Sequence, residues 1–203
     1  MAASAATGIY LREISGGGAI TVDTAAGVTV DIDGVRRSDF DSSTTSVAQV
    51  RSVASLEDLT TRTSNGPIKL VAEGGTITIN GGADTAGVSA NGTGGTGEML
   101  LEARGATSDV VVNATMTSGS GHITLDADRN VDVNAAVTVS SGSGTIYVLS
   151  GMDTDIDAQV STASGDVLLE AGDDLRQTAL VRSMDGDIGL IAGDSIAQGV
   201  DGD

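Results

Sequence analysis

Aromatic residues, cysteine and proline are almost or entirely missing from this chain of 203 residues. The aromatic residues are Tyr10, Phe40 and Tyr147, so any core must be packed from Val, Ile, Leu and Ala. The absence of cysteine excludes disulfides and thiolate metal sites. With only one proline, Pro67, the 29 glycines indicate regular turns and not a disordered Pro/Gly-rich tract. The composition therefore predicts a thin but continuous core.

Basic residues are scarce as well, with 10 against 28 acidic residues and a net charge of −18. The net charge argues against nucleic acid as a partner, because phosphates would be repelled over most of the chain, and cations are the natural counterpart. No apolar run has membrane-spanning length, so we expect no membrane span. The start, MAASAATGIYLREI, lacks the basic and apolar regions of a signal peptide. We expect any export signal to lie outside this segment.

A short phrase, G-x-Φ-x-Φ-x-A with Φ apolar, recurs along the chain and is the strongest pattern in it. Its copies begin at Gly66, Gly97, Gly121, Gly144, Gly165 and Gly186. The spacing between them shortens along the chain and settles at a period of about 21–24 residues. An earlier phrase, GAITVDT from Gly18, lies two such periods before Gly66. The repeats are therefore expected to begin near the N-terminus.

Apolar residues alternate within each phrase, as in Ile123 and Leu125, which is the period of a half-buried strand. A second alternating run follows each phrase, for example Val131 and Val133, so each repeat holds two or three short strands. Coils stacked about 4.8 Å apart would join these thin cores into one column. The sequence predicts an all-β fold, a right-handed parallel β-helix with coils of about 21–24 residues. An antiparallel sandwich is the main alternative.

Stacking in register predicts ladders of equivalent side chains inside the coils. One aliphatic ladder contains Ile68, Met99, Ile123, Ile146, Val167 and Ile188, and the other contains Leu70, Leu101, Leu125, Val148, Leu169 and Leu190. Gln177 and Gln198, which hold equivalent positions in the last two repeats, are expected to form an inward amide ladder.

The chain is expected to be one continuous solenoid, with degenerate coils over 1–65 and regular repeats over 66–203. An insertion is predicted around 34–65, where the rhythm is lost. Within it, 47–59 has the spacing of a short helix or an irregular coil. A degenerate coil with a long loop is the alternative.

Aspartates recur at equivalent positions of the repeats. Asp166 and Asp187 form one pair, and Asp173 and Asp194 form another. Such stacked carboxylates must be solvated, splayed or bridged by a cation. We favour turn aspartates that accept backbone hydrogen bonds, with bridging calcium as the alternative.

The spacing D-x-D-x-D resembles the first half of an EF-hand loop, but the glycine and glutamate that complete such a loop are missing. Its members are Asp153, Asp155 and Asp157. A solvated face is favoured over a shared calcium ion, and no cofactor is required.

Catalytic patterns are sparse. No G-x-S-x-G elbow occurs, and the single histidine, His122, falls at an outward position where a surface role without a partner is expected. Arg176 and Arg182, near Asp173 and Asp174, mark the one region where acids and bases could converge in a carbohydrate-active β-helix. We expect no enzymatic activity.

The phrase G-D-[IV]-x-L-x-A-G-D occurs at 165–173 and at 186–194. It resembles the repeat regions of filamentous-haemagglutinin-like and other giant bacterial surface adhesins over roughly 66–203. That resemblance implies a right-handed β-helix outside a Gram-negative cell. The chain departs from the family in lacking its amino-terminal secretion domain with the N-P-N-G motif.

The expected function is a structural or adhesive segment of a large extracellular surface or filament protein. The chain ends in mid-pattern, so end-to-end self-association or continuation into flanking repeats is expected. A cell-surface glycan or protein receptor is the further expected partner. The alternatives are a calcium-dependent binding module and a carbohydrate-active β-helix.

Overall fold

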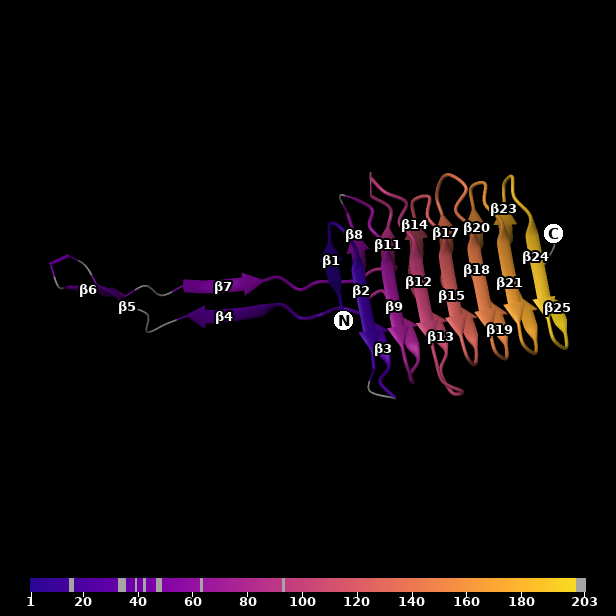
Figure 1. Ribbon diagram of the computed structural model, residues 1–203, viewed down its shortest axis with the longest axis horizontal. Helices are drawn as coiled ribbons and strands as arrows, with labels where there is room; N and C mark the ends of the chain where they lie inside the picture. Colours follow the sequence, from indigo (N-terminus) through magenta and orange to yellow (C-terminus); the bar gives the residue numbers. More distant parts are fainter. Residues whose placement is uncertain are drawn as a thin grey trace.

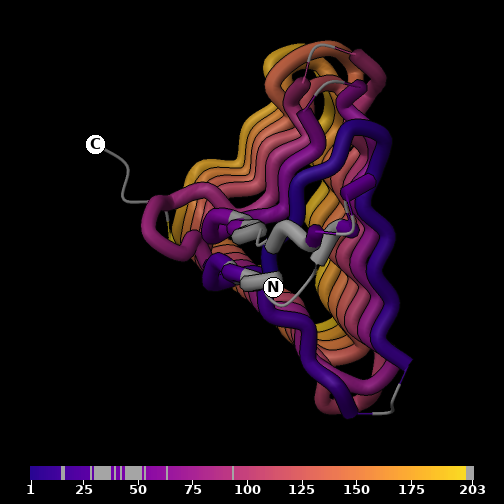
Figure 2. The backbone as a smooth tube through the Cα atoms, turned by 90° about the vertical axis from the view of Figure 1, so that its left-hand side faces the viewer, coloured from indigo at the N-terminus to yellow at the C-terminus, as the bar shows by residue number. Residues whose placement is uncertain are grey.

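The computed structural model describes residues 1–14, 17–32, 36–38, 40–41, 43–46, 49–62, 64–92 and 94–199. Three parallel sheets of seven strands and two small antiparallel pairs make up this part of the chain, without any helix and thus without a helical membrane span. Successive coils stack along one axis and superpose when seen along it (Figures 1 and 2). The parallel β-helix is thereby confirmed, and parallel pairing rules out the antiparallel sandwich.

Each coil contributes one strand to each of three sheets. Sheet A contains β1 (Ala3–Ala5), β8 (Leu59–Thr61), β11 (Ala86–Ala90), β14 (Thr115–Ser118), β17 (Val137–Val139), β20 (Val160–Thr162) and β23 (Val181–Ser183). Sheet B contains β2 (Ile9–Glu13), β9 (Ile68–Ala72), β12 (Met99–Ala103), β15 (Ile123–Ala127), β18 (Ile146–Ser150), β21 (Val167–Ala171) and β24 (Ile188–Ala192). Sheet C contains β3 (Ile20–Val22), β10 (Ile77–Ile79), β13 (Val110–Val112), β16 (Val131–Val133), β19 (Thr154–Ile156), β22 (Leu175–Gln177) and β25 (Ile196–Gln198).

Both predicted aliphatic ladders are present in sheet B, where the strands from β9 to β24 pair in the predicted register. Their members are buried in the middle coils, and the aliphatic side chains of the other two sheets complete the interior. The predicted amide ladder is also present, since Gln198 Nε2 donates to Gln177 Oε1 at 3.0 Å.

Glycine recurs at the start of each sheet B phrase because the turn backbones of neighbouring coils touch there. A Cβ atom added to Gly144 would lie 2.4 Å from the carbonyl oxygen of Gly121, and one added to Gly165 would lie 2.1 Å from that of Gly144. Side chains never approach a backbone oxygen so closely. The anchor glycines are thus a packing requirement of the stack.

The start of the repeats differs from the sequence prediction. The phrase after Gly18 belongs to sheet C, where Ile20 pairs with Ile77. The first strand of sheet B is instead β2, in which Ile9 pairs with Ile68. All three sheets alternate apolar and outward residues, so the alternation alone could not tell which sheet the phrase joins.

The predicted insertion is a β-hairpin and its bounds differ. Strand β4 (Val28–Ile32) pairs antiparallel with β7 (Gln49–Val53), and β5 (Arg36–Ser38) pairs with β6 (Thr44–Ser46). The hairpin projects beyond the first coil along the solenoid axis (Figure 1). Of the two alternatives for 47–59, the helix is wrong for the described residues 49–59, which comprise β7, a connection over 54–58 and the first residue of β8. Residues 47 and 48 lie outside the described residues.

The anchor glycines give a direct test of the stacking. The variant Gly144→Ala should lower the free energy of unfolding by about 1–3 kcal/mol, because its methyl group must push two turns apart. Gly199→Ala is the matched control, since nothing lies within 4 Å of the Cβ it would add. Urea unfolding monitored by circular dichroism measures both. Equal stabilities would contradict the packing role.

Candidate functional site

From β10 onward, the position just before each sheet C strand carries a polar side chain, and these side chains connect successive coils. In each case a side-chain oxygen accepts the backbone N–H of the equivalent residue one coil later, at 3.1 to 3.2 Å. This pre-strand ladder consists of Thr76, Asp109, Asn130, Asp153, Asp174 and Ser195. Asp153 of the D-x-D-x-D run is therefore a backbone acceptor, which is the role favoured for the turn aspartates.

The other two acids of that run have a different partner. Arg176, one coil later, donates to Asp155 at 2.7 Å and to Asp157 at 2.8 Å. The hydroxyl of Thr178 also donates to Asp157, at 2.5 Å. The bond from Thr178, followed by that from Arg176, holds the pKa of Asp157 below its ordinary value. The three carboxylates thus do not share one site, since Asp155 and Asp157 both face the guanidinium of Arg176 and Asp153 accepts a backbone N–H.

Asp166 and Asp187 stack as predicted. The backbone N–H of Asp187 donates to Asp166 Oδ1 at 2.9 Å, so a hydrogen bond joins the two coils at this pair. The two residues lie at the start of sheet B strands and not beside the other predicted acids.

The second predicted pair, Asp173 and Asp194, does form part of an acidic cluster. Together with Asp174 these exposed residues offer carboxylate oxygens that lie within 4.8 Å of one another. The charge of Asp174 is the main cause that raises the pKa of Asp173, followed by burial, Asp153 and Asp194. Oxygen ligands at this spacing suit a calcium ion that keeps several waters.

Asp174 was not among the predicted calcium ligands, although the sequence contained the signal. It directly follows Asp173 in a Gly-Asp-Asp turn, and the Gly-Asp of that turn recurs one repeat later at Asp194. The ion pair between Arg176 and Asp155 was likewise predictable from the sequence, because these residues also hold equivalent positions in successive repeats.

The two arginines named for a carbohydrate-active alternative do not lie together beside Asp173 and Asp174. Arg176 lies in sheet C against Asp155, in a pocket that Asp174 also lines, whereas Arg182 lies in sheet A beside Ser161. His122 is exposed as predicted, but it has a partner, since the backbone N–H of Thr145 donates to its Nδ1 at 3.1 Å.

Comparison with protein-family models, with curated proteins and with solved structures gave no match. The resemblance to surface adhesins therefore stays a prediction that rests on the repeat phrases.

One buried carboxyl group stands apart from these surface acids. Asp58, at the start of β8 where the chain returns from the hairpin, is 9% exposed, and its Oδ1 has no hydrogen-bond partner among the described residues. Burial, and then the charges of Asp84 and Glu57, raise its pKa to about 6. The folded chain therefore holds this proton more tightly than the unfolded chain does.

That raised pKa makes stability fall as the pH rises from about 4 to above 6, because the carboxylate form is disfavoured in the fold. Asp58→Asn should raise the free energy of unfolding by about 1–2 kcal/mol at pH 7, allowing for solvent screening, and hardly change it at pH 4. Asparagine tolerates the φ of 63° at this position. Urea unfolding at the two pH values measures the difference.

Asp157→Asn serves as the control of opposite sign. The pKa of Asp157 is lowered in the fold, so this variant should be less stable than the wild type at pH 7 and similar to it at low pH. A pH-independent effect of Asp58→Asn would contradict the assignment.

Proposed function

We propose that the chain is a rod-like structural and adhesive segment of an extracellular surface or filament protein, in which further coils stack on its end. The observation that carries the proposal is an interior that is left open at the last described coil. Ile188 is 44% exposed and Ile196 is 45% exposed, whereas their equivalents one coil earlier, Val167 and Leu175, are each 1% exposed.

The strand edges at this end support the same proposal. Strands β23, β24 and β25 are the last strands of their sheets and pair on one side only within the described part of the chain. Unpaired backbone groups along a flat edge are a template for another strand. A coil from a flanking repeat or from a second copy would satisfy these groups and cover the aliphatic side chains.

The opposite end is different. There the hairpin formed by β4 and β7 projects past the first coil, along the direction in which a further coil would stack (Figure 1). We therefore propose that association takes place at the C-terminal coil. We propose no reaction for the chain, and the resemblance of the repeat phrases to adhesins supports a location at the cell surface.

Charge on the inner side of the last coil should abolish association. Ile188→Asp places a carboxylate where a stacked coil would bury it, so sedimentation velocity over a concentration series should show larger species for the wild type and monomers for the variant. Ile191→Asp is the matched control, since Ile191 is 50% exposed on the outward side of the same strand and pairs with Glu170. A wild type that stays monomeric at high concentration would contradict the proposal.

A second candidate function is calcium-dependent binding, favoured by the cluster of Asp173, Asp174 and Asp194. With a Kd of about 1 mM, typical of extracellular modules, 10 mM calcium would stabilise the fold by about 1.4 kcal/mol. Thermal melting in calcium and then in chelator should differ by about 3–5 °C.

Asp174→Asn should remove this calcium response while keeping the fold, because its amide oxygen can still accept the backbone N–H of Ser195. Asp174→Ala should also destabilise the calcium-free chain, since it loses that acceptor. Asp166→Asn is the control outside the cluster and should respond to calcium as the wild type does. A wild-type melt that calcium leaves unchanged would eliminate this candidate.

A further inference from the structure

The outer side of sheet A is free of acidic residues, although the chain carries 28 of them. None of the seven strands of this sheet contains Asp or Glu, whereas acidic residues of neighbouring strands stack in sheets B and C. The outward residues of neighbouring sheet A strands pair in register and form one row along the axis. The row is Ser4, Thr60, Ser89, Thr117, Thr138, Ser161 and Arg182.

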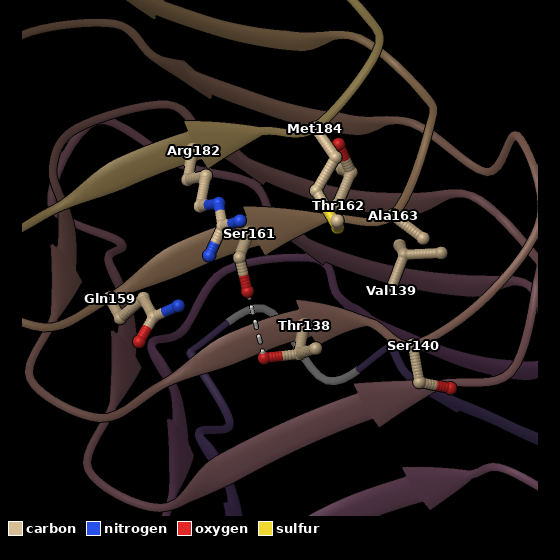
Figure 3. Close-up of a pocket in the computed structure, with 9 residues that line it drawn as sticks. All are labelled: Thr138, Val139, Ser140, Gln159, Ser161, Thr162, Ala163, Arg182 and Met184. Atoms are coloured by element: carbon tan, nitrogen blue, oxygen red, sulfur yellow. Dashed lines mark hydrogen bonds between the residues drawn. The ribbon is translucent and has the colours of Figure 1, made fainter.

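Two shallow pockets on this face share the same chemistry. Figure 3 shows the first, in which the hydroxyls of Thr138 and Ser161 lie 3.3 Å apart, with the amide of Gln159 and the guanidinium of Arg182 beside them. The second pocket includes Thr60 and Ser89 of adjacent coils, with the amide of Asn91 and the guanidinium of Arg62. Each pocket thus offers one cation, one amide and more than two hydroxyls.

The arginines of these pockets have no acidic partner among the described residues, unlike the other four arginines whose side chains the structure describes. Those four, Arg12, Arg104, Arg129 and Arg176, each contact a carboxylate. Arg62 and Arg182 form no ion pair with any residue that the structure describes. In so acidic a chain, two guanidinium groups are thereby left available for an external anion, which they can bind through two parallel hydrogen bonds.

The dimensions of the face decide what kind of partner it fits. Arg62 follows β8 and Arg182 lies in β23, five coils further along, which is about 24 Å at about 4.8 Å per coil. The strands are three to five residues long, so the face is only about 10–16 Å wide. An area of roughly 240–380 Å² is well below the roughly 800 Å² per partner of a stable protein interface. A linear polymer lying along the axis matches this shape.

We propose that the outer face of sheet A binds a linear acidic polysaccharide, laid along the solenoid axis. Arg62 and Arg182 each pair with a carboxylate or sulfate group of the polymer, and the hydroxyl row and the two amides bind its sugar hydroxyls. The inference rests on the proposed adhesive function, for which it names a ligand class and a surface. No covalent step is involved.

The test titrates the full chain with three oligosaccharides of about ten sugars at 0.15 M salt, where charges beyond about 8 Å are largely screened. A polyuronate and a sulfated polymer should bind, and their relative affinities identify the preferred anion. A neutral glucan should bind at least about tenfold more weakly. Equal binding of the neutral polymer, or no binding of either acidic one, overturns the inference.

Matched variants locate the surface. Arg182→Gln and Arg62→Gln should each weaken binding about tenfold or more. Lys69→Gln, which removes a cation without an ion pair among the described residues but on sheet B, should leave it unchanged. Equal loss in all three variants, or loss in none, overturns the assignment to sheet A.

A carboxylate introduced into the hydroxyl row of sheet A tests the same surface in the opposite way, because it should repel an acidic polymer. Ser161→Asp should abolish binding of the acidic polymers, whereas Thr124→Asp, at an outward position of sheet B, should not. Circular dichroism confirms that each variant is folded. Ile188→Asp should still bind the polysaccharide as a monomer, so failure of the ligand inference and failure of rod assembly are separate results.

Discussion

The structure depends on the hydrogen bonds that each coil makes to the next through its backbone. These bonds form only if the turns, as well as the strands, approach to the spacing of paired strands, about 4.8 Å. At the corner before sheet B this approach leaves no room for a Cβ atom, which is why Gly121, Gly144 and Gly165 follow one another. At the corner before sheet C the pre-strand ladder adds side-chain acceptors, so a polar residue takes the place that glycine has at the other corner.

Stacking also determines how charge is distributed, because any residue on a coil lies directly against its equivalents. Where carboxylates stack, the carboxylate faces a guanidinium, as Asp155 does, accepts a backbone N–H, as Asp166 does, or has a raised pKa, as Asp173 does. Sheet A avoids the problem, since its outward row contains hydroxyls and one arginine. The surface of the rod is thereby divided into acidic faces and one neutral, hydrogen-bonding face, and we assign cations to the former and a glycan to the latter.

The repeat period predicts the features that recur at a constant spacing from coil to coil. It does not predict features that lack this spacing. The two ladders of sheet B follow from the regular spacing of the repeat phrases, which sets the register of Ile123 on Ile146. The hydroxyl row of sheet A could not be predicted, because loops of varying length separate its members. For example, the stretch from Thr60 to Ser89 is longer than the stretch from Thr117 to Thr138. The sequence indicates a helix or an irregular coil where the structure has the hairpin, because an insertion has no equivalent segment in the other repeats. No sequence pattern marks Asp58, because its raised pKa arises from burial where the hairpin rejoins the coils.

The most direct test of in-register stacking uses the absence of cysteine from the natural chain. Neighbouring outward residues of sheet A are about 4.8 Å apart, within the Cα separation that a disulfide spans, whereas residues two coils apart are about 9.6 Å apart. The double variant Thr138→Cys/Ser161→Cys should therefore form an intramolecular disulfide on mild oxidation, measured by thiol titration and mass spectrometry. The variant Thr138→Cys/Arg182→Cys should keep two free thiols. Cross-linking of the second pair and not the first would contradict the stacked coils on which both functional proposals depend.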